Sequence, residues 1–253
     1  MKTTKVEFLN QRGEKLAGYI DMPVHPNENG EFAIFAHCFT CSKELKAIQN
    51  ISLPLTRRGI SVLRFDMTGI GESEGSFPET NFTTQISDFL SAAEFLEKEY
   101  KTPALLMGHS LGGCVALYAA SKLPETKAIV TIASPEEPAN LSIKLKRTKQ
   151  RAIKYGVAEA EIGGVKFNFK PQFFSDIETY NLKAVQKAIN IPYLILHSVA
   201  DTYSDFSNAE ILYQHANQPK SLISLDDIDH LMLNKEDAAY VGELIAVWSK
   251  KYI

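Results

Sequence analysis

The chain has 253 residues, of which 45% are hydrophobic and 23% are charged, so it is long enough to bury a sizeable core in one large domain or two small ones. Its formal net charge of −3 argues against a nucleic-acid partner. The three cysteines are few and odd in number, which argues against a secreted, disulfide-stapled scaffold and favours a reducing compartment. Because the first ten residues lack the apolar stretch of a signal peptide and no apolar run approaches the length of a membrane span, we expect a cytoplasmic protein.

Short apolar segments and amphipathic segments alternate along most of the chain. Strands are expected at 5–10, 15–23, 32–38, 61–67, 103–109, 128–134, 192–198 and 221–227. The first two are expected to form a hairpin that turns at Arg12 and Gly13. Helices are expected at 43–58, 83–100, 112–122, 204–216 and 235–250. Pro54 is expected to kink or interrupt the first helix. Strands that alternate with amphipathic helices predict an α/β fold, here a mostly parallel eight-stranded sheet with helices on both faces.

One long segment between two of the predicted strands interrupts this alternation. Its residues 139–170 carry eight Lys or Arg against two Glu, 141–156 have a helical pattern, and 163–174 alternate like a short hairpin. A segment of this length indicates an inserted subdomain, here a small helical cap between the sixth and seventh strands. Its basic face is interpreted as a solvated helix surface, in preference to one that attracts an anionic substrate or a membrane. The resulting division is a core of residues 1–134 and 191–253 and a cap, or lid, of residues 135–190.

The sequence GHSLGG, residues 108–113, lies where a predicted strand gives way to a predicted helix. In this context the pattern G-x-S-x-G predicts a nucleophilic serine, Ser110. A tight turn there strains the serine backbone and lifts its hydroxyl clear of the sheet. The same turn brings Gly108 and Gly112 together, so both must be small. The amides that begin the following helix point to the place where negative charge would develop.

A serine hydroxyl becomes a good nucleophile only when a base accepts its proton and an acid orients that base. In sheets of this type the order along the chain is serine, acid, histidine, which selects Asp201 after the seventh predicted strand and His230 after the eighth. Both follow the carboxyl ends of predicted parallel strands, the edge where ligands bind. Asp205 is the rival acid and is interpreted as a cap of the next helix. Asp229 is expected to point elsewhere along the chain.

Over nearly its whole length the chain resembles the α/β-hydrolase superfamily, in its esterase and serine-aminopeptidase (S33)-like branch. The segment RFDMTGIGESEGSF at 64–77 is similar to the loop after the fourth strand in that branch, which includes the capped cinnamoyl esterases. The segments HCFTC, HSVADTYSDFSNAE and DDIDHLM are most similar to hydrolases that are sometimes fused to an OsmC-like domain. By this resemblance we expect an α/β-hydrolase fold in a stand-alone domain.

In this family the third strand ends in a His-Gly-x motif, and the amide of x is one donor to the reaction's oxyanion. The resemblance makes His37 the motif histidine, puts Cys38 in place of the glycine and assigns the amide to Phe39. The amide of Leu111 is the expected second donor. The residues assigned to substrate binding are His37, Cys38, His109, Phe173 and Phe174. A structural role for His109 and simple core packing of the two phenylalanines stay open.

Cys38 and Cys41 form a Cys-x-x-Cys pair, which raises the question of a metal or a disulfide. A zinc site would want two more ligands at similar spacing, and the sequence has no second Cys-x-x-Cys, so no metal is expected. Cysteine at position 38 restricts the backbone more than glycine would. A reversible disulfide between the two would therefore disturb the oxyanion amide, which is one hypothesis for redox control. Cys114 is expected to be a small core residue.

Together these features predict a serine hydrolase that cleaves carboxylic esters with small or medium acyl or aryl groups through an acyl-enzyme, with neither a metal nor an organic cofactor. The expected partner is a small-molecule ester, and a homodimer stays open. The alternatives are a serine-aminopeptidase-like peptidase, a thioesterase, and a non-catalytic binding protein on the same fold. A peptidase needs an acidic anchor for the substrate's free amine. The cap region offers few acidic residues for this purpose, namely Glu136, Glu137, Glu159 and Glu161.

Overall fold

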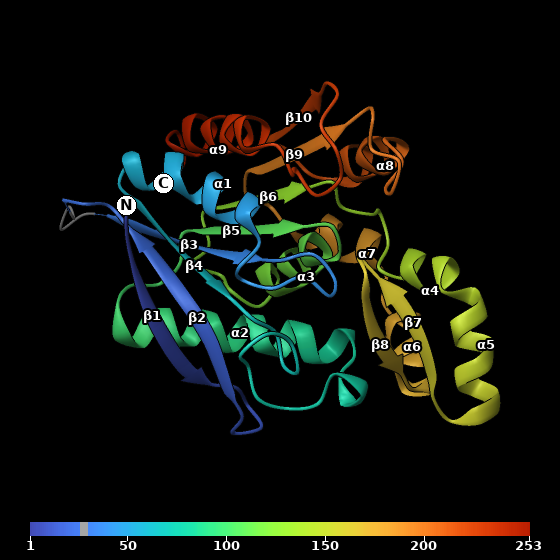
Figure 1. Ribbon diagram of the computed structural model, residues 1–253. Helices are drawn as coiled ribbons and strands as arrows, with labels where there is room; N and C mark the ends of the chain where they lie inside the picture. The colour runs from blue at the N-terminus through green and yellow to red at the C-terminus, as the bar shows by residue number, and fades with distance from the viewer. Residues whose placement is uncertain (26–29) are drawn as a thin grey trace.

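The computed structural model describes residues 1–25 and 30–253, which are built around a central sheet (Figure 1). Its strands are β1 (Lys2–Leu9), β2 (Lys15–Met22), β3 (Glu31–Ala36), β4 (Ile60–Phe65), β5 (Leu105–His109), β6 (Ala128–Ile132), β9 (Tyr193–Ser198) and β10 (Lys220–Leu225). They lie in the order β1-β2-β4-β3-β5-β6-β9-β10, and β1, β2 and β4 pair antiparallel while the pairs from β4 to β10 are parallel. The mostly parallel, eight-stranded sheet expected from the sequence is confirmed.

Helices cover both faces of this sheet (Figure 1). On one face lie α1 (Lys46–Arg57) and α9 (Lys235–Ser249), and on the other lie α2 (Phe82–Glu99), α3 (Leu111–Ala120) and α8 (Ser207–His215). Successive strand residues therefore enter different cores. In β3, Phe35 packs in the core beneath α1 and α9, whereas Ile34 and Ala36 pack in the core beneath α2 and α3. Burial on both faces explains why the inner strands are apolar runs without alternation.

The loop after β3 is longer than the sequence predicts, since α1 begins at Lys46 and not at residue 43. The backbone amide of Lys43 instead donates to Asp66 Oδ1 at 2.7 Å, which ties this loop to the end of β4. Pro54 lies inside α1 and does not interrupt it. The first hairpin forms as expected, with β1 and β2 in register on either side of the turn.

The segment between β6 and β9 has its own secondary structure, seen on the right of Figure 1. It contains α4 (Asn140–Lys144), α5 (Lys146–Tyr155), β7 (Ala158–Ile162), β8 (Val165–Phe169), α6 (Pro171–Ile177) and α7 (Leu182–Ala188). The hairpin expected at 163–174 is wrong in position, because Gly163 and Gly164, with φ of 59° and 79°, form its turn and not its start. Pro171 then begins α6, as its fixed φ favours. The role of this segment as a lid stays a prediction.

A short 3-10 helix, η1 (Phe77–Glu79), precedes α2 and faces the hairpin formed by β7 and β8. Across residues 1–25 and 30–253, no helix combines the length and the apolarity that crossing a membrane requires.

Candidate active site

Ser110 lies on the turn from β5 to α3 with φ of 55° and ψ of −127°, a conformation that a serine adopts only under strain. Two glycines allow the turn. A Cβ atom on Gly108 would lie 2.1 Å from the carbonyl oxygen of Gly112, and a Cβ on Gly112 would lie 2.4 Å from that of Ala36. The expected need for small residues at both positions is confirmed. The amide of Ser110 donates to the carbonyl of Ile132 at 2.8 Å, which fixes the turn to β6.

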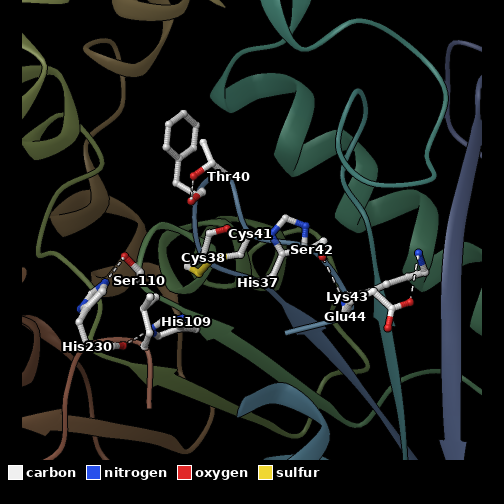
Figure 2. The surroundings of a disulfide bond; sticks show 12 residues. His37, Cys38, Thr40, Cys41, Ser42, Lys43, Glu44, His109, Ser110 and His230 are labelled. Carbon is white, nitrogen blue, oxygen red and sulfur yellow. Dashed lines mark hydrogen bonds and ion pairs between the residues drawn. A yellow bond between two sulfur atoms is a disulfide. The ribbon is translucent and has the colours of Figure 1, made fainter. Parts of the chain in front are cut away.

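The structure brings Ser110, His230 and Asp201 into one hydrogen-bonded chain. The distance from Ser110 Oγ to His230 Nε2 is 3.1 Å (Figure 2). The distance from His230 Nδ1 to Asp201 Oδ2 is 2.7 Å. Burial raises the pKa of Asp201, but hydrogen bonds from His230 and from backbone amides outweigh it and hold that pKa below its usual value. The carboxylate is therefore ionised and accepts the Nδ1 proton. This leaves Nε2 free to accept the proton of the serine hydroxyl.

Two backbone amides fix the orientation of the Asp201 carboxylate. Its Oδ1 accepts from the amides of Tyr203 and Ser204, both at 2.8 Å, so only Oδ2 faces the histidine. The Tyr203 ring then packs against the imidazole of His230, with ring centroids 4.6 Å apart. Tyr203 was not identified as a site residue from the sequence. Its position only two residues after Asp201 is the sequence signal that would have indicated a contact between the two.

His109 does not lie where a substrate can reach it, which corrects its assignment to substrate binding. It is fully buried, and its Nε2 donates to the backbone carbonyl of His230 at 2.7 Å (Figure 2). Burial, together with the nearby His230, lowers the pKa of His109 to about 3, so the ring is neutral. Its role in the structure is to hold the His230 backbone in place. The structural alternative left open by the sequence describes it best.

The rival acids point away from the histidine, as expected. Asp205 is exposed, and its Oδ1 accepts from the amide of Ser207 at 2.9 Å in the first turn of α8. Asp229 accepts from the amides of Leu231 and Leu233 at 2.9 and 3.0 Å, which uses both of its carboxylate oxygens.

A cavity beside Ser110 is lined by both residues that the sequence assigns to the oxyanion. Phe39 reaches it from the loop after β3, and Leu111 from the first turn of α3. In the described part of the chain neither backbone amide donates to an acceptor. Both residues thus line the cavity at Ser110 and have a backbone amide that donates to no acceptor among the described residues, which is a requirement for a donor to an oxyanion.

Cys38 and Cys41 form a disulfide, with Cα atoms 5.3 Å apart (Figure 2). The amide of Cys41 also donates to the carbonyl of Cys38 at 3.0 Å, so the bond closes a tight turn with Phe39 and Thr40 at its centre. Thr40 has φ of 65°, a region that β-branched residues rarely adopt. One hypothesis from the sequence is that a disulfide here disturbs the oxyanion amide. In the structure the bond is formed, and Phe39 still lines the cavity beside Ser110.

His37 and Cys38 are also placed differently from their expected role in substrate binding. Both are buried, and they line a separate small cavity with Thr40 and Met67. His37 uses both ring nitrogens, since Nδ1 donates to the carbonyl of Cys38 at 2.8 Å and Nε2 accepts from the amide of Met67 at 3.3 Å. Burial lowers the pKa of His37 and keeps it neutral. It fixes the loop and has no nitrogen left for a substrate.

A buried lysine anchors the other end of this loop. The side chain of Lys43 is 1% exposed, and its ammonium lies 2.7 Å from Asp66 Oδ2 and 2.8 Å from Glu72 Oε2. Burial lowers the pKa of Lys43, but these two carboxylates raise it above its ordinary value. Arg64 donates to the Lys43 carbonyl from the same side. The sequence offered no sign of this network, because its members come from different loops and strands.

Phe173 and Phe174 are core residues of the segment between β6 and β9, being 2% and 1% exposed. Phe173 packs on Phe39 with ring centroids 5.4 Å apart and on Phe169 at 5.2 Å. Their assignment to a substrate pocket is therefore replaced by the packing alternative. The aromatic cluster connects this segment to the loop that carries the Phe39 amide.

The remaining residues with metal or thiol chemistry are accounted for. Among residues 1–25 and 30–253, His, Cys, Asp and Glu side chains form no group of three that could hold a metal ion. Cys114 is fully buried in α3, and burial raises the pKa of its thiol, so it is the core residue expected from the sequence.

Comparison with known proteins supports a hydrolytic function. Residues 41–159 match the family described as serine aminopeptidase, S33. The crystal structure of the esterase domain of a Rhodothermus marinus protein is 41% identical, with a TM-score of 0.79 over 100% of this chain and 99% of that one. Est1E from Butyrivibrio proteoclasticus, solved with ferulic acid bound, has the same fold, with 20% identity and a TM-score of 0.78 over 98% and 99% of the two chains. Monoglyceride lipase of Rattus norvegicus is 23% identical in an alignment of 261 positions, gaps included, that covers 86% of each protein. The chain therefore belongs to the esterases of the α/β-hydrolase superfamily and is a serine hydrolase.

Proposed function

We propose that the protein is a carboxylesterase in which Ser110 is the nucleophile, His230 the general base and Asp201 the acid that orients it. The observation that carries this proposal is the continuous hydrogen-bonded chain, 3.1 Å from serine to histidine and 2.7 Å from histidine to aspartate. Both distances are within the reach that proton transfer requires. The strained φ of Ser110 and the two unpartnered amides beside it are what acyl transfer needs as well.

The reaction proceeds in two halves. His230 accepts the proton of Ser110 as its oxygen attacks the ester carbonyl, and the resulting oxyanion is stabilised by the amides of Phe39 and Leu111. The imidazolium, stabilised by Asp201, then donates its proton to the leaving alcohol, which leaves an acyl-enzyme. Water attacks the acyl carbonyl while His230 accepts its proton. Collapse of this second oxyanion returns the proton to Ser110 and releases the carboxylic acid.

Esters are favoured over peptides because two of the four acidic side chains that could anchor a free amine, Glu137 and Glu159, are engaged elsewhere. Glu137 accepts from the amide of Leu182 at 2.8 Å, at the start of α7. Glu159 pairs with Lys166 at 3.0 Å on the hairpin. The names of similar proteins also support an ester substrate, since they include an esterase domain and a monoglyceride lipase.

The test combines active-site labelling with a substrate panel. A fluorophosphonate should label the parent on Ser110, and nitrophenyl esters from acetate to palmitate, with a hydroxycinnamate ester and a thioester, should report the preferred acyl group. The Ser110→Ala variant should lose both labelling and turnover, the latter by several orders of magnitude, on the pattern of roughly 10⁶-fold for a triad nucleophile. Turnover that survives in this variant within about tenfold would exclude Ser110 as the nucleophile.

A further inference from the structure

Lys144, the last residue of α4, lies at the cavity beside Ser110. It lines that cavity together with Ser110, Leu111 and Tyr203, and it also lines the adjoining opening above Asp201. Lys144 is an exposed residue, yet its ammonium turns inward. The nitrogen donates to the carbonyl of Tyr203 and lies 3.7 Å above the centre of the Tyr203 ring. That ring is the one that packs on His230.

The charge of Lys144 has no direct counter-ion. In the part of the chain that the structure describes, no carboxylate oxygen lies within 4.0 Å of its nitrogen. Two other lysines of the same segment do have one: Lys149 pairs with Glu178 at 2.5 Å, and Lys166 with Glu159 at 3.0 Å. Partial burial lowers the pKa of Lys144, opposed by the charge of Asp201. Lys144 and the reactive serine thus line one cavity, and among the described residues no carboxylate pairs directly with the ammonium.

The ammonium also has unused hydrogen-bonding capacity. It carries three N–H donors, and the carbonyl of Tyr203 accepts one of them. The others are available to a ligand in the cavity. Hydrogen bonds from an ammonium to a carboxylate are about twice as strong as those between neutral groups. An anionic group on the substrate would therefore be recognised here more strongly than a neutral polar group.

We propose that Lys144 determines specificity, and that the preferred substrate is an ester whose acyl or alcohol part carries a carboxylate, which the Lys144 ammonium binds while Ser110 attacks the ester carbonyl. This inference rests on the proposed esterase function and names the substrate class of that site. It singles out one lysine of the basic segment, whose other charges remain the solvated surface expected from the sequence.

A purely structural role for Lys144 predicts something different. Its bond to Tyr203 connects α4 to the loop that carries Asp201, so loss of the side chain would disturb the site for every ester. A role in recognition predicts a loss confined to anionic esters. The two roles are separated by comparing neutral and anionic substrates of matched size.

The experiment measures kcat and KM for matched pairs. In the first pair type the anion is on the acyl part: p-nitrophenyl hemisuccinate and hemiglutarate against the neutral butyrate and valerate. In the second it is on the alcohol part: 3-carboxyphenyl acetate against phenyl acetate. The variants are Lys144→Met, Lys144→Arg and, as a matched control, Lys146→Met, which removes an exposed lysine two residues further along. Folding of each variant is checked by circular dichroism and by fluorophosphonate labelling of Ser110.

We expect the parent to favour the anionic member of at least one pair type. Lys144→Met should lower kcat/KM for that anionic ester by about 10- to 100-fold, chiefly through KM, and change the neutral ester by less than about threefold. Lys144→Arg should retain most of the preference, and Lys146→Met should match the parent. The proposal is overturned if the parent shows no anionic preference in either pair type, or if Lys144→Met lowers both members of a pair equally. In those cases serine-dependent cleavage of neutral esters still supports the esterase. Absence of both turnover and Ser110 labelling would reject the esterase function as well.

Discussion

Replacing Asp201 by asparagine tests the direction of proton flow that the site geometry implies. The Asp201 carboxylate accepts three hydrogen bonds, two from backbone amides on Oδ1 and one from His230 on Oδ2. An asparagine that keeps its oxygen on the two amides must turn its NH₂ group toward His230 Nδ1. Because that group donates, Nδ1 must become the acceptor and the ring proton moves to Nε2. A protonated Nε2 cannot accept the proton of Ser110.

The size of the effect follows from these lost interactions. The variant has the wrong tautomer, and it also lacks the negative charge that stabilises the imidazolium in the transition state. Such a change lowers kcat by about 10⁴-fold where it has been made in a serine-histidine-aspartate site. This corresponds to about 5 kcal/mol of transition-state stabilisation. Since the shape of the side chain is unchanged and two of its three hydrogen bonds are kept, we expect the free energy of unfolding to change much less.

The assay is kcat/KM for p-nitrophenyl butyrate in parent, Asp201→Asn and Asp205→Asn. Asp205 is the matched control because it is four residues further along, exposed, and bonded to the amide of Ser207 at a helix start, where asparagine caps equally well. We expect Asp205→Asn to retain the parent rate within about twofold. A loss of less than about tenfold in Asp201→Asn, or a comparable loss in Asp205→Asn, would refute the assignment.

Two further predictions concern the loop and the core behind the site. Reduction of the Cys38–Cys41 disulfide should loosen the turn that carries the Phe39 amide and so lower kcat. The decrease should be smaller than the roughly 100-fold cost of losing an oxyanion donor. The kcat of the double variant Cys38→Ala/Cys41→Ala should not change when reductant is added. An unchanged parent rate, with reduction verified by thiol titration, would contradict this. His109 has a pKa of about 3 in the folded protein and takes up a proton near pH 6.5 when unfolded. Between these values the unfolded state binds the extra proton, so His109 makes stability fall as pH falls. His109→Gln should therefore reduce the slope of unfolding free energy against pH by about 1.4 kcal/mol per unit between pH 6 and 4, measured by urea denaturation; equal slopes would reject it.

The sequence predicts the parts of the molecule that depend on short-range patterns. The inner strands are recognisable because burial on both faces makes them continuous apolar runs, as in β5 and β6. The order of Ser110, Asp201 and His230 is readable because each follows the end of a parallel strand, and such ends meet at one edge of the sheet. The exposed hairpin of β7 and β8 is harder to place, since polar strands and their glycine turn lack an apolar signal.

Contacts between distant segments are beyond such patterns. Lys144 and Tyr203 are 59 residues apart, and their contact depends on how α4 packs beside the loop after β9. The burial of a particular side chain is equally difficult to predict from the sequence. His109 and Phe173 are residue types that are common in binding sites, yet both are buried by neighbouring helices and strands. A polar or aromatic side chain near a motif is therefore a weak guide to substrate contact, because tertiary packing decides which side chains face the cavity.

The close approach at Gly112 has a consequence for which substitutions can alter the substrate preference of this enzyme. The backbone of α3 rests directly on the carbonyls of Ala36 and His37, with no side chain between them to adjust. The two segments that supply the Phe39 and Leu111 amides are thus in backbone contact, and neither can be reshaped without the other. α4 also lines the cavity, and there the contact is through a side chain: Lys144 is exposed and touches the loop after β9 through its ammonium. Mutational libraries intended to broaden acyl preference should be concentrated on the residues of α4 that line the cavity, such as Leu141 and Lys144.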